Sequence, residues 1–112
     1  MYNHPVDRVL LSAASVDETA ATFEKSVNAQ SQQGFHHHIS WGTGVTAGVV
    51  QIEVADSADY EGTWAPVATV TFAGTAPKQD YVYQPGQPKA IRHRISTVVA
   101  NGTVTTRLVG AL

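Results

Sequence analysis

One stretch, residues 47–72, constrains the fold more than any other part of the chain. Its sequence is AGVVQIEVADSADYEGTWAPVATVTF. In its first half Val50, Ile52 and Val54 alternate with other residues, and a period of two is typical of a strand buried on one face. A polar run then leads to Trp64, and the segment after it alternates in the same way up to Phe72. We therefore predict a β-hairpin, with Trp64 packing its loop onto the domain.

Short alternating segments separated by turn residues continue through the chain. Besides the hairpin, we expect strands at residues 8–15, 19–27, 35–41, 81–83, 90–97 and 103–109. The composition of the first two segments also suits a helix, but their short length favours strands. About eight short strands without a convincing helix indicate an all-β domain over residues 1–112: an antiparallel β-sandwich or jelly roll, with a closed barrel as the alternative. Residues 1–7 lack periodicity and are expected to form an extended N-terminal arm.

The pair Asn101 and Gly102 is the strongest turn signal in the sequence. Both residues tolerate the positive φ angles that a type I′ turn requires. We expect the strands on either side of this pair to form a second hairpin.

Composition excludes several classes of function. Only 14% of the 112 residues are charged, against roughly 25% in an ordinary globular domain, and the net charge is −2. Without a basic cluster, we expect no binding to nucleic acid. The chain has no cysteine, which excludes disulfides, thiol catalysis and Cys-ligated zinc. No apolar run approaches the roughly 20 residues of a membrane span, so a soluble protein made in the cytoplasm is expected.

Three consecutive histidines suggest a metal site. On a strand the middle residue, His37, points away from its neighbours, so only His36 and His38 can act together. No acidic residue lies near them in sequence, and we favour a polar strand face or a subunit contact over a metal. His93 lies between Ile91 and Ile95 in an alternating strand, which favours a hydrogen-bonded histidine in the core or at an interface.

Two charged groups are further candidates. Asp56, Asp59 and Glu61 share one loop, where carboxylates can bind Ca²⁺, but the twelve-residue calcium-binding pattern is missing and we favour a solvated turn. Arg92 and Arg94 lie on the same strand face and can either meet an acidic partner surface or remain solvated. No nucleophile motif, paired-carboxylate motif or glycine-rich phosphate loop is present, so we expect no enzyme activity, cofactor or resident metal.

Two segments carry a resemblance to a known group of proteins. VVQIEVADSADYEGTWAPVATVTF and the final KAIRHRISTVVANGTVTTRLVGAL resemble small β-sandwich structural proteins of tailed bacteriophages. The shared elements are residues 51–57, 62–64, 92–96 and 102–110. The resemblance implies a virion component, made in the host cytoplasm, that binds the major capsid protein at the capsid surface as a decoration or cement protein, with a trimer as the favoured homo-oligomer. We expect the partner contacts to involve Tyr2, His4, Pro5, His36, His38, Arg92 and Arg94.

Two alternatives share the predicted fold. A carbohydrate-binding module would use exposed aromatic rings, for which the candidates are Trp41, Tyr60, Trp64, Tyr81 and Tyr83. A tail or baseplate accessory protein would differ from a capsid protein only in its position on the virion.

Overall fold

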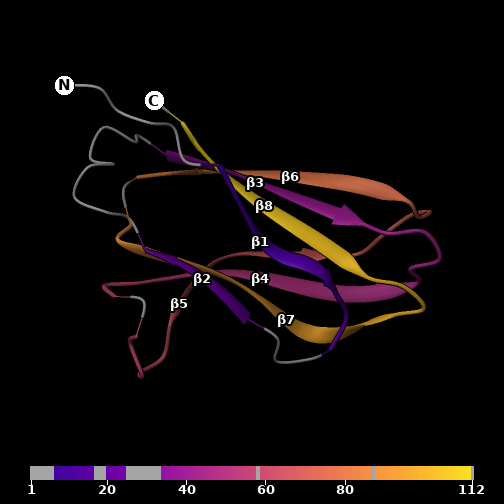
Figure 1. Cartoon of the computed structure of the whole chain (residues 1–112), viewed down its shortest axis with the longest axis horizontal. Helices are drawn as coiled ribbons and strands as arrows, with labels where there is room; N and C mark the ends of the chain where they lie inside the picture. Colours follow the sequence, from indigo (N-terminus) through magenta and orange to yellow (C-terminus); the bar gives the residue numbers. More distant parts are fainter. Residues whose placement is uncertain (1–6, 17–19, 25–33, 58, 87, 112) are drawn as a thin grey trace.

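Eight strands form two antiparallel four-stranded sheets that pack face to face (Figure 1). The structure, a computed structural model, describes residues 7–16, 20–24, 34–57, 59–86 and 88–111. The strands are β1 (Asp7–Ala14), β2 (Ala20–Glu24), β3 (Gly34–Trp41), β4 (Ala47–Ala55), β5 (Ala65–Thr71), β6 (Lys78–Pro85), β7 (Ala90–Ala100) and β8 (Val104–Ala111). The predicted all-β sandwich is confirmed, and the closed-barrel alternative is wrong because the strands divide into two separate sheets.

The strand order shows how the chain wraps. The first sheet has the order β1-β8-β3-β6 and the second has the order β2-β7-β4-β5. Four antiparallel pairs, β1 with β8, β2 with β7, β3 with β6 and β4 with β5, alternate between the two sheets. This is the order produced when one long double-stranded ribbon, with β4 and β5 at its closed end, wraps into two layers.

The hairpin predicted for residues 47–72 is that closed end. Val50 pairs with Val70 and Ile52 pairs with Ala68, so the two alternating patterns face the core together. Val50 and Ile52 are completely buried. Every other consecutive pair of strands lies in different sheets.

The second predicted hairpin, at Asn101 and Gly102, is wrong. The strands on either side of this turn, β7 and β8, lie in different sheets: β7 pairs with β2 and β4, whereas β8 pairs with β1 and β3. Asn101 does have a positive φ of 65°, and its side-chain amide donates to Thr46 Oγ1 at 2.8 Å. The turn therefore crosses the end of the sandwich, and each flanking strand pairs with two other strands of its own sheet.

The core lies between the two sheets. Alternation on β3 places Phe35, Ile39 and Trp41 inward, and alternation on β7 places Ile91 and Ile95 inward. All five are among the largest fully buried side chains. Burial of such side chains, at roughly 1.5–3 kcal/mol each, supplies most of the energy that holds the sheets together.

Strand β1 bulges where it meets β8. The register shifts between Val9 and Ala14, and Ala13 has a φ of 48°. Two threonines of β8 accept hydrogen bonds here: Thr106 Oγ1 accepts from the backbone N–H of Leu11 at 3.1 Å and Thr105 Oγ1 from that of Ala13 at 3.0 Å.

Of the predicted N-terminal arm, residues 1–6 lie outside the described residues. Asp7, which was predicted to belong to the arm, is instead paired with Val109 at the start of β1.

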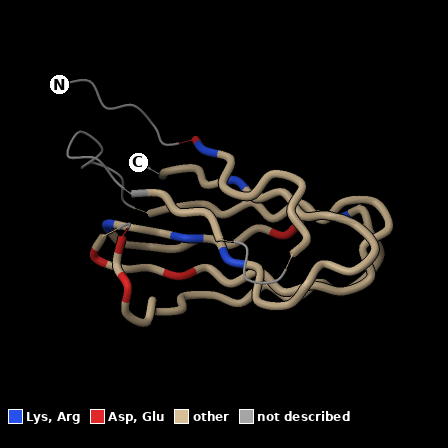
Figure 2. Tube along the Cα trace, turned by 60° about the horizontal axis from the view of Figure 1, so that its bottom comes forward, with Lys and Arg blue, Asp and Glu red and all other residues tan. Residues whose placement is uncertain are grey.

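Charged residues are sparse along the trace (Figure 2). Among the described residues, no helix is long and apolar enough to cross a membrane.

Candidate functional site

A chain of hydrogen bonds between buried polar side chains crosses the core. His37 on β3 and His93 on β7 belong to opposite sheets, and His37 Nδ1 lies 2.7 Å from His93 Nε2. The other nitrogen of His37, Nε2, lies 2.8 Å from Gln84 Oε1, and the other nitrogen of His93, Nδ1, lies 2.7 Å from Thr106 Oγ1. Both histidines have no exposed surface.

When both imidazoles are neutral, the Gln84 end of this chain sets the direction of its hydrogen bonds. The backbone N–H of Leu11 can only donate, and it donates to Thr106 Oγ1. Gln84 Oε1 can only accept, so the proton of His37 lies on Nε2 and its Nδ1 accepts from His93 Nε2. His93 Nδ1 then accepts from the hydroxyl of Thr106. In this arrangement each ring nitrogen of the two neutral imidazoles has a partner.

Burial opposes protonation of both histidines. Loss of hydration, offset in part by the hydrogen bond to Gln84, lowers the pKa of His37 from 6.5 to about 4. Loss of hydration and the nearby His37 lower the pKa of His93 from 6.5 to about 3. A proton added to His37 would go to Nδ1, where it meets the N–H of His93 Nε2, and a proton added to His93 would go to Nδ1, where it meets the hydroxyl hydrogen of Thr106. The contact between the two rings joins the two sheets. Because neither ring reaches solvent, the pair has no access to a substrate.

The outer face of the first sheet carries a different set of histidines. As predicted, His36 and His38 share this face, and each contacts a tyrosine of β6. The rings of His36 and Tyr83 have centroids 4.9 Å apart, and those of His38 and Tyr81 have centroids 4.8 Å apart in an edge-to-face arrangement. Tyr81 is 64% exposed and Tyr83 53% exposed.

The favoured interpretations of the histidine run, a polar strand face or a subunit contact, both agree with this arrangement. Within the part of the chain that the structure describes, no cluster of three or more His, Cys, Asp or Glu side chains could hold a metal ion. The expected absence of a resident metal stays a prediction.

The predicted arginine pair lies on the outer face of the second sheet, where it surrounds a buried carboxylate. Arg92 Nη2 lies 2.6 Å from Glu53 Oε1, and Arg94 Nη2 lies 3.3 Å from Glu53 Oε2. Glu53 is only 5% exposed. The guanidinium of Arg92 also lies 4.6 Å from the ring centroid of Trp64. Three charges thus form an ion triad with a net charge of about +1 and partly exposed arginines.

The predicted partner contacts do not form one surface. His36 and His38 lie on one outer face of the sandwich, whereas Arg92 and Arg94 lie on the other, with the core between them. Tyr2, His4 and Pro5 lie outside the described residues. A flat partner could cover one of the two faces but not both.

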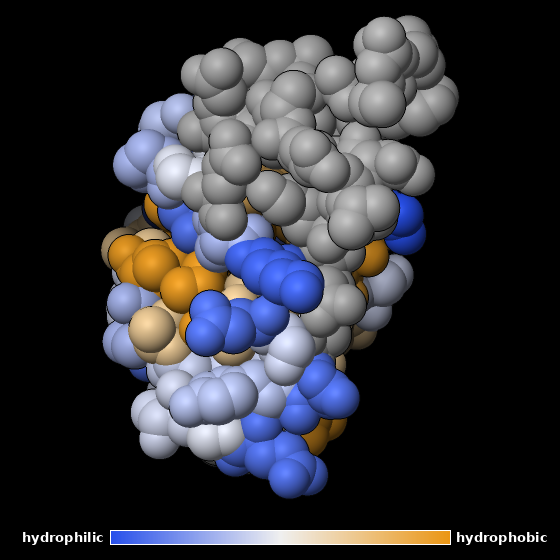
Figure 3. Space-filling view, turned by 90° about the vertical axis from the view of Figure 1, so that its left-hand side faces the viewer, coloured by the Kyte–Doolittle hydropathy of each residue, from blue (hydrophilic) through white to orange (hydrophobic). Residues whose placement is uncertain are grey.

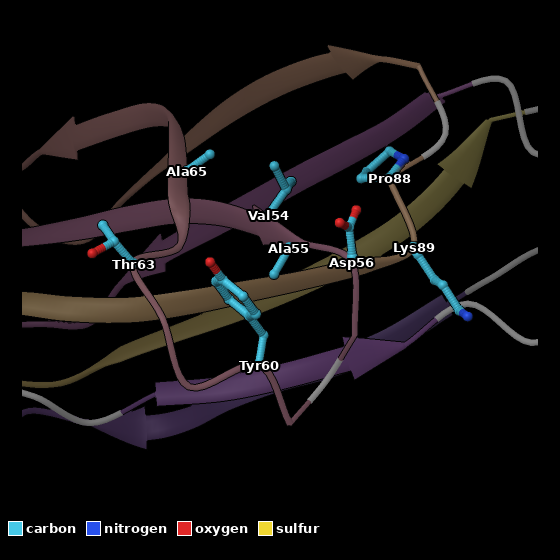
Figure 4. Close-up of a pocket in the computed structure, with 8 residues that line it drawn as sticks. All are labelled: Val54, Ala55, Asp56, Tyr60, Thr63, Ala65, Pro88 and Lys89. Carbon is cyan, nitrogen blue, oxygen red and sulfur yellow. The ribbon is translucent and has the colours of Figure 1, made fainter.

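The acidic loop of the β4–β5 hairpin borders an open hollow of about 460 Å³ (Figure 4). Asp56 and Tyr60 line it, together with Lys89 from the β6–β7 connection, whose side chain points away from Asp56. Asp59 and Glu61 are exposed and do not line it. At this end of the sandwich hydrophilic side chains cover much of the described surface, beside a smaller hydrophobic area (Figure 3). This arrangement favours the interpretation of a solvated turn.

Both tryptophans are buried. Trp64 is 4% exposed and its indole N–H donates to the backbone carbonyl of Tyr60 at 3.0 Å, so its predicted role in packing the loop is confirmed. Trp41 is 1% exposed and donates to Asp80 Oδ2 at 2.8 Å. Neither ring is free to stack on a ligand.

The sequence did not predict three partners of these histidines and arginines: Gln84 and Thr106 in the buried hydrogen bonds, and Glu53 in the ion triad. Each becomes visible only when the strand pairing is known. Glu53, for example, stands directly opposite Arg92 in the β4–β7 ladder.

No protein-family model, curated protein or solved structure matches this chain.

Proposed function

We propose that this protein is a structural component of a tailed-bacteriophage virion that binds the assembled capsid and stabilises it without catalysis. Its partner is the major capsid protein, and its location is the capsid surface. On the capsid it forms a homo-oligomer, for which we favour a trimer.

The strand order is the observation that carries this proposal. Sheets ordered β1-β8-β3-β6 and β2-β7-β4-β5, with each strand pair coming from one wrapped ribbon, fit an eight-stranded jelly roll. Viral capsid domains use this architecture, although lectins and cupins use it as well. We therefore infer a jelly roll, and the sequence resemblance to phage structural proteins favours the virion among these classes.

The surface of the second sheet fits a docking role. Arg92 and Arg94 stand above a buried Glu53 that holds both guanidinium groups, and the net positive charge suits an acidic partner surface. A guanidinium already fixed by its own carboxylate loses little conformational entropy on binding. We propose this face as the contact with the capsid.

The burial of both tryptophans argues against a carbohydrate-binding module that stacks sugars on Trp41 or Trp64, whereas Tyr60, Tyr81 and Tyr83 are exposed. Trp41 and Trp64 together expose too little surface to form a stacking platform. A tail or baseplate position remains the second candidate, because it would use the same fold and the same kind of contact.

The proposal is tested with phage particles that lack the protein. We expect them to assemble but to release their DNA at a lower temperature, or after a milder osmotic shock, than complete particles. Adding back the purified protein should restore resistance. A variant in which Arg92 and Arg94 are both replaced by Gln should bind particles more weakly, whereas replacement of the exposed Arg8 by Gln should have no effect. Particles of unchanged stability would contradict the proposal.

A further inference from the structure

A polar hollow lies on the outer face of the first sheet, on the side of the sandwich opposite to the ion triad. Its volume is about 280 Å³, just below the roughly 300–1,000 Å³ typical of ligand pockets. Strands β1, β3, β6 and β8 all contribute to it. The lining residues are Val9, His38, Ser40, Gln79, Thr105 and Arg107.

Strand register holds these side chains in two adjacent rows. In one row His38 stands opposite Arg107 of β8 and opposite Tyr81 of β6. In the next row Ser40 stands opposite Thr105 and opposite Gln79. Strands β3 and β8 are the central strands of the sheet, so the groups sit on its most rigid part. Groups fixed by regular backbone are preorganised for binding.

The lining suits an anionic group. Arg107 is its one cation, and no carboxylate lines it. Among the described residues Arg107 has one acidic partner, Asp7, whose Oδ1 lies 3.4 Å from Arg107 Nε. Both side chains of this pair are more than half exposed, so the pair contributes little and leaves the Nη groups of Arg107 accessible. A ligand carboxylate can therefore bind Arg107 through two N–H groups.

The remaining groups suit a ring that carries hydroxyls. The hydroxyls of Ser40 and Thr105, the amide of Gln79 and the imidazole of His38 each provide a donor and an acceptor. Tyr81 lies beside the hollow and contacts two residues that line it: its ring packs against His38 and its hydroxyl donates to Gln79 Oε1. Most of its ring remains exposed. An aromatic surface beside several polar groups combines a stacking platform with hydrogen-bond partners.

We propose that this hollow binds one carboxylate-bearing sugar ring, of the uronic acid class, with the carboxylate on Arg107 and one face of the ring against Tyr81. The volume admits a single ring. The proposal does not depend on the virion function, and the hollow stays open when a partner covers Arg92 and Arg94 on the opposite face.

Titration of the isotope-labelled protein with trigalacturonic acid, followed by amide chemical shifts, tests this site. We expect saturable chemical-shift changes at residues of β3, β6 and β8 around the hollow. The uncharged analogue galactotriose should bind about tenfold more weakly, because it cannot make the contact between a carboxylate and Arg107. Arg107→Gln should weaken the binding of trigalacturonic acid about tenfold, and Tyr81→Ala about fivefold.

Two matched variants serve as controls. Arg8→Gln removes the same charge from an exposed residue outside the hollow, and Tyr60→Ala removes an exposed tyrosine elsewhere, so both should bind like the parent protein. Urea unfolding curves of all four variants establish that they are folded at the titration conditions. Absence of binding, equal binding of the neutral trisaccharide, or unchanged binding by Arg107→Gln would each overturn the proposal.

Discussion

Acid should separate the two sheets, because both buried histidines must stay neutral in the folded protein. The pKa of His37 falls from 6.5 to about 4 on folding, and that of His93 falls from 6.5 to about 3. The unfolded chain therefore takes up protons first as the pH falls. Little stability is lost above about pH 7, and the loss grows as the pH falls through 6.5 toward the folded-state values.

The size of the effect follows from this difference. At pH 4.5 each histidine costs the folded state about 2.5 kcal/mol, so the pair costs about 5 kcal/mol. Native domains are commonly stable by about 5–15 kcal/mol, so this loss is a large share of the total. Between pH 5 and 6, where most carboxylates are still ionised, the free energy of unfolding should fall by about 2.5 kcal/mol per pH unit.

Urea unfolding at a series of pH values measures this slope. His93→Gln removes one of the two buried titrating groups, so the slope between pH 5 and 6 should fall to about 1.2 kcal/mol per pH unit. This expectation does not depend on how much the substitution lowers the free energy of unfolding at pH 7. His36→Gln changes an exposed histidine of the same strand run and should keep a slope close to that of the parent. A free energy of unfolding that is the same at pH 5 and pH 7.5, or a full slope in His93→Gln, would refute the account of the pair.

Two further stability predictions follow from the packing. Glu53→Gln leaves two arginines without their carboxylate and should lower the free energy of unfolding by about 2 kcal/mol, measured by urea unfolding, whereas Glu61→Gln in the exposed loop should change it by less than about 0.5 kcal/mol. Gly44 and Gly86 have similar φ angles, 91° and 95°. A Cβ atom added to Gly44 would lie 2.7 Å from the carbonyl oxygen of Asn101, whereas a Cβ atom added to Gly86 would meet no atom within 4 Å. Gly86→Ala should therefore lower the free energy of unfolding by about 1 kcal/mol, and Gly44→Ala should lower it clearly more, as measured by urea unfolding. Equal losses in the two variants would contradict the predicted clash.

Local pattern was enough to predict the strands and the faces they bury. The alternation in residues 47–72 and 35–41 depends only on the period of two along each strand. The hairpin is confirmed, and so is the prediction that His37 points away from His36 and His38. The inward position of His93 follows in the same way. Each of these predictions needs no knowledge of which strands are neighbours.

Contacts between distant strands could not be predicted in this way. His37 and His93 are 56 positions apart, and their contact depends on how the two sheets align. The same limit explains the error at Asn101: its positive φ is a local property, but whether the flanking strands pair is decided by the other strands that compete for them. Glu53 looked like an ordinary outward residue because its partner Arg92 belongs to a strand 39 positions away.

Electron cryo-microscopy of the purified phage particle tests the proposed function most directly. The account predicts density for an eight-stranded sandwich at repeated positions on the outside of the capsid, with the face that carries Arg92 and Arg94 toward the major capsid protein and the hollow at Arg107 toward solvent. Density for this chain on the tail or baseplate alone, or no density in the particle, would contradict it.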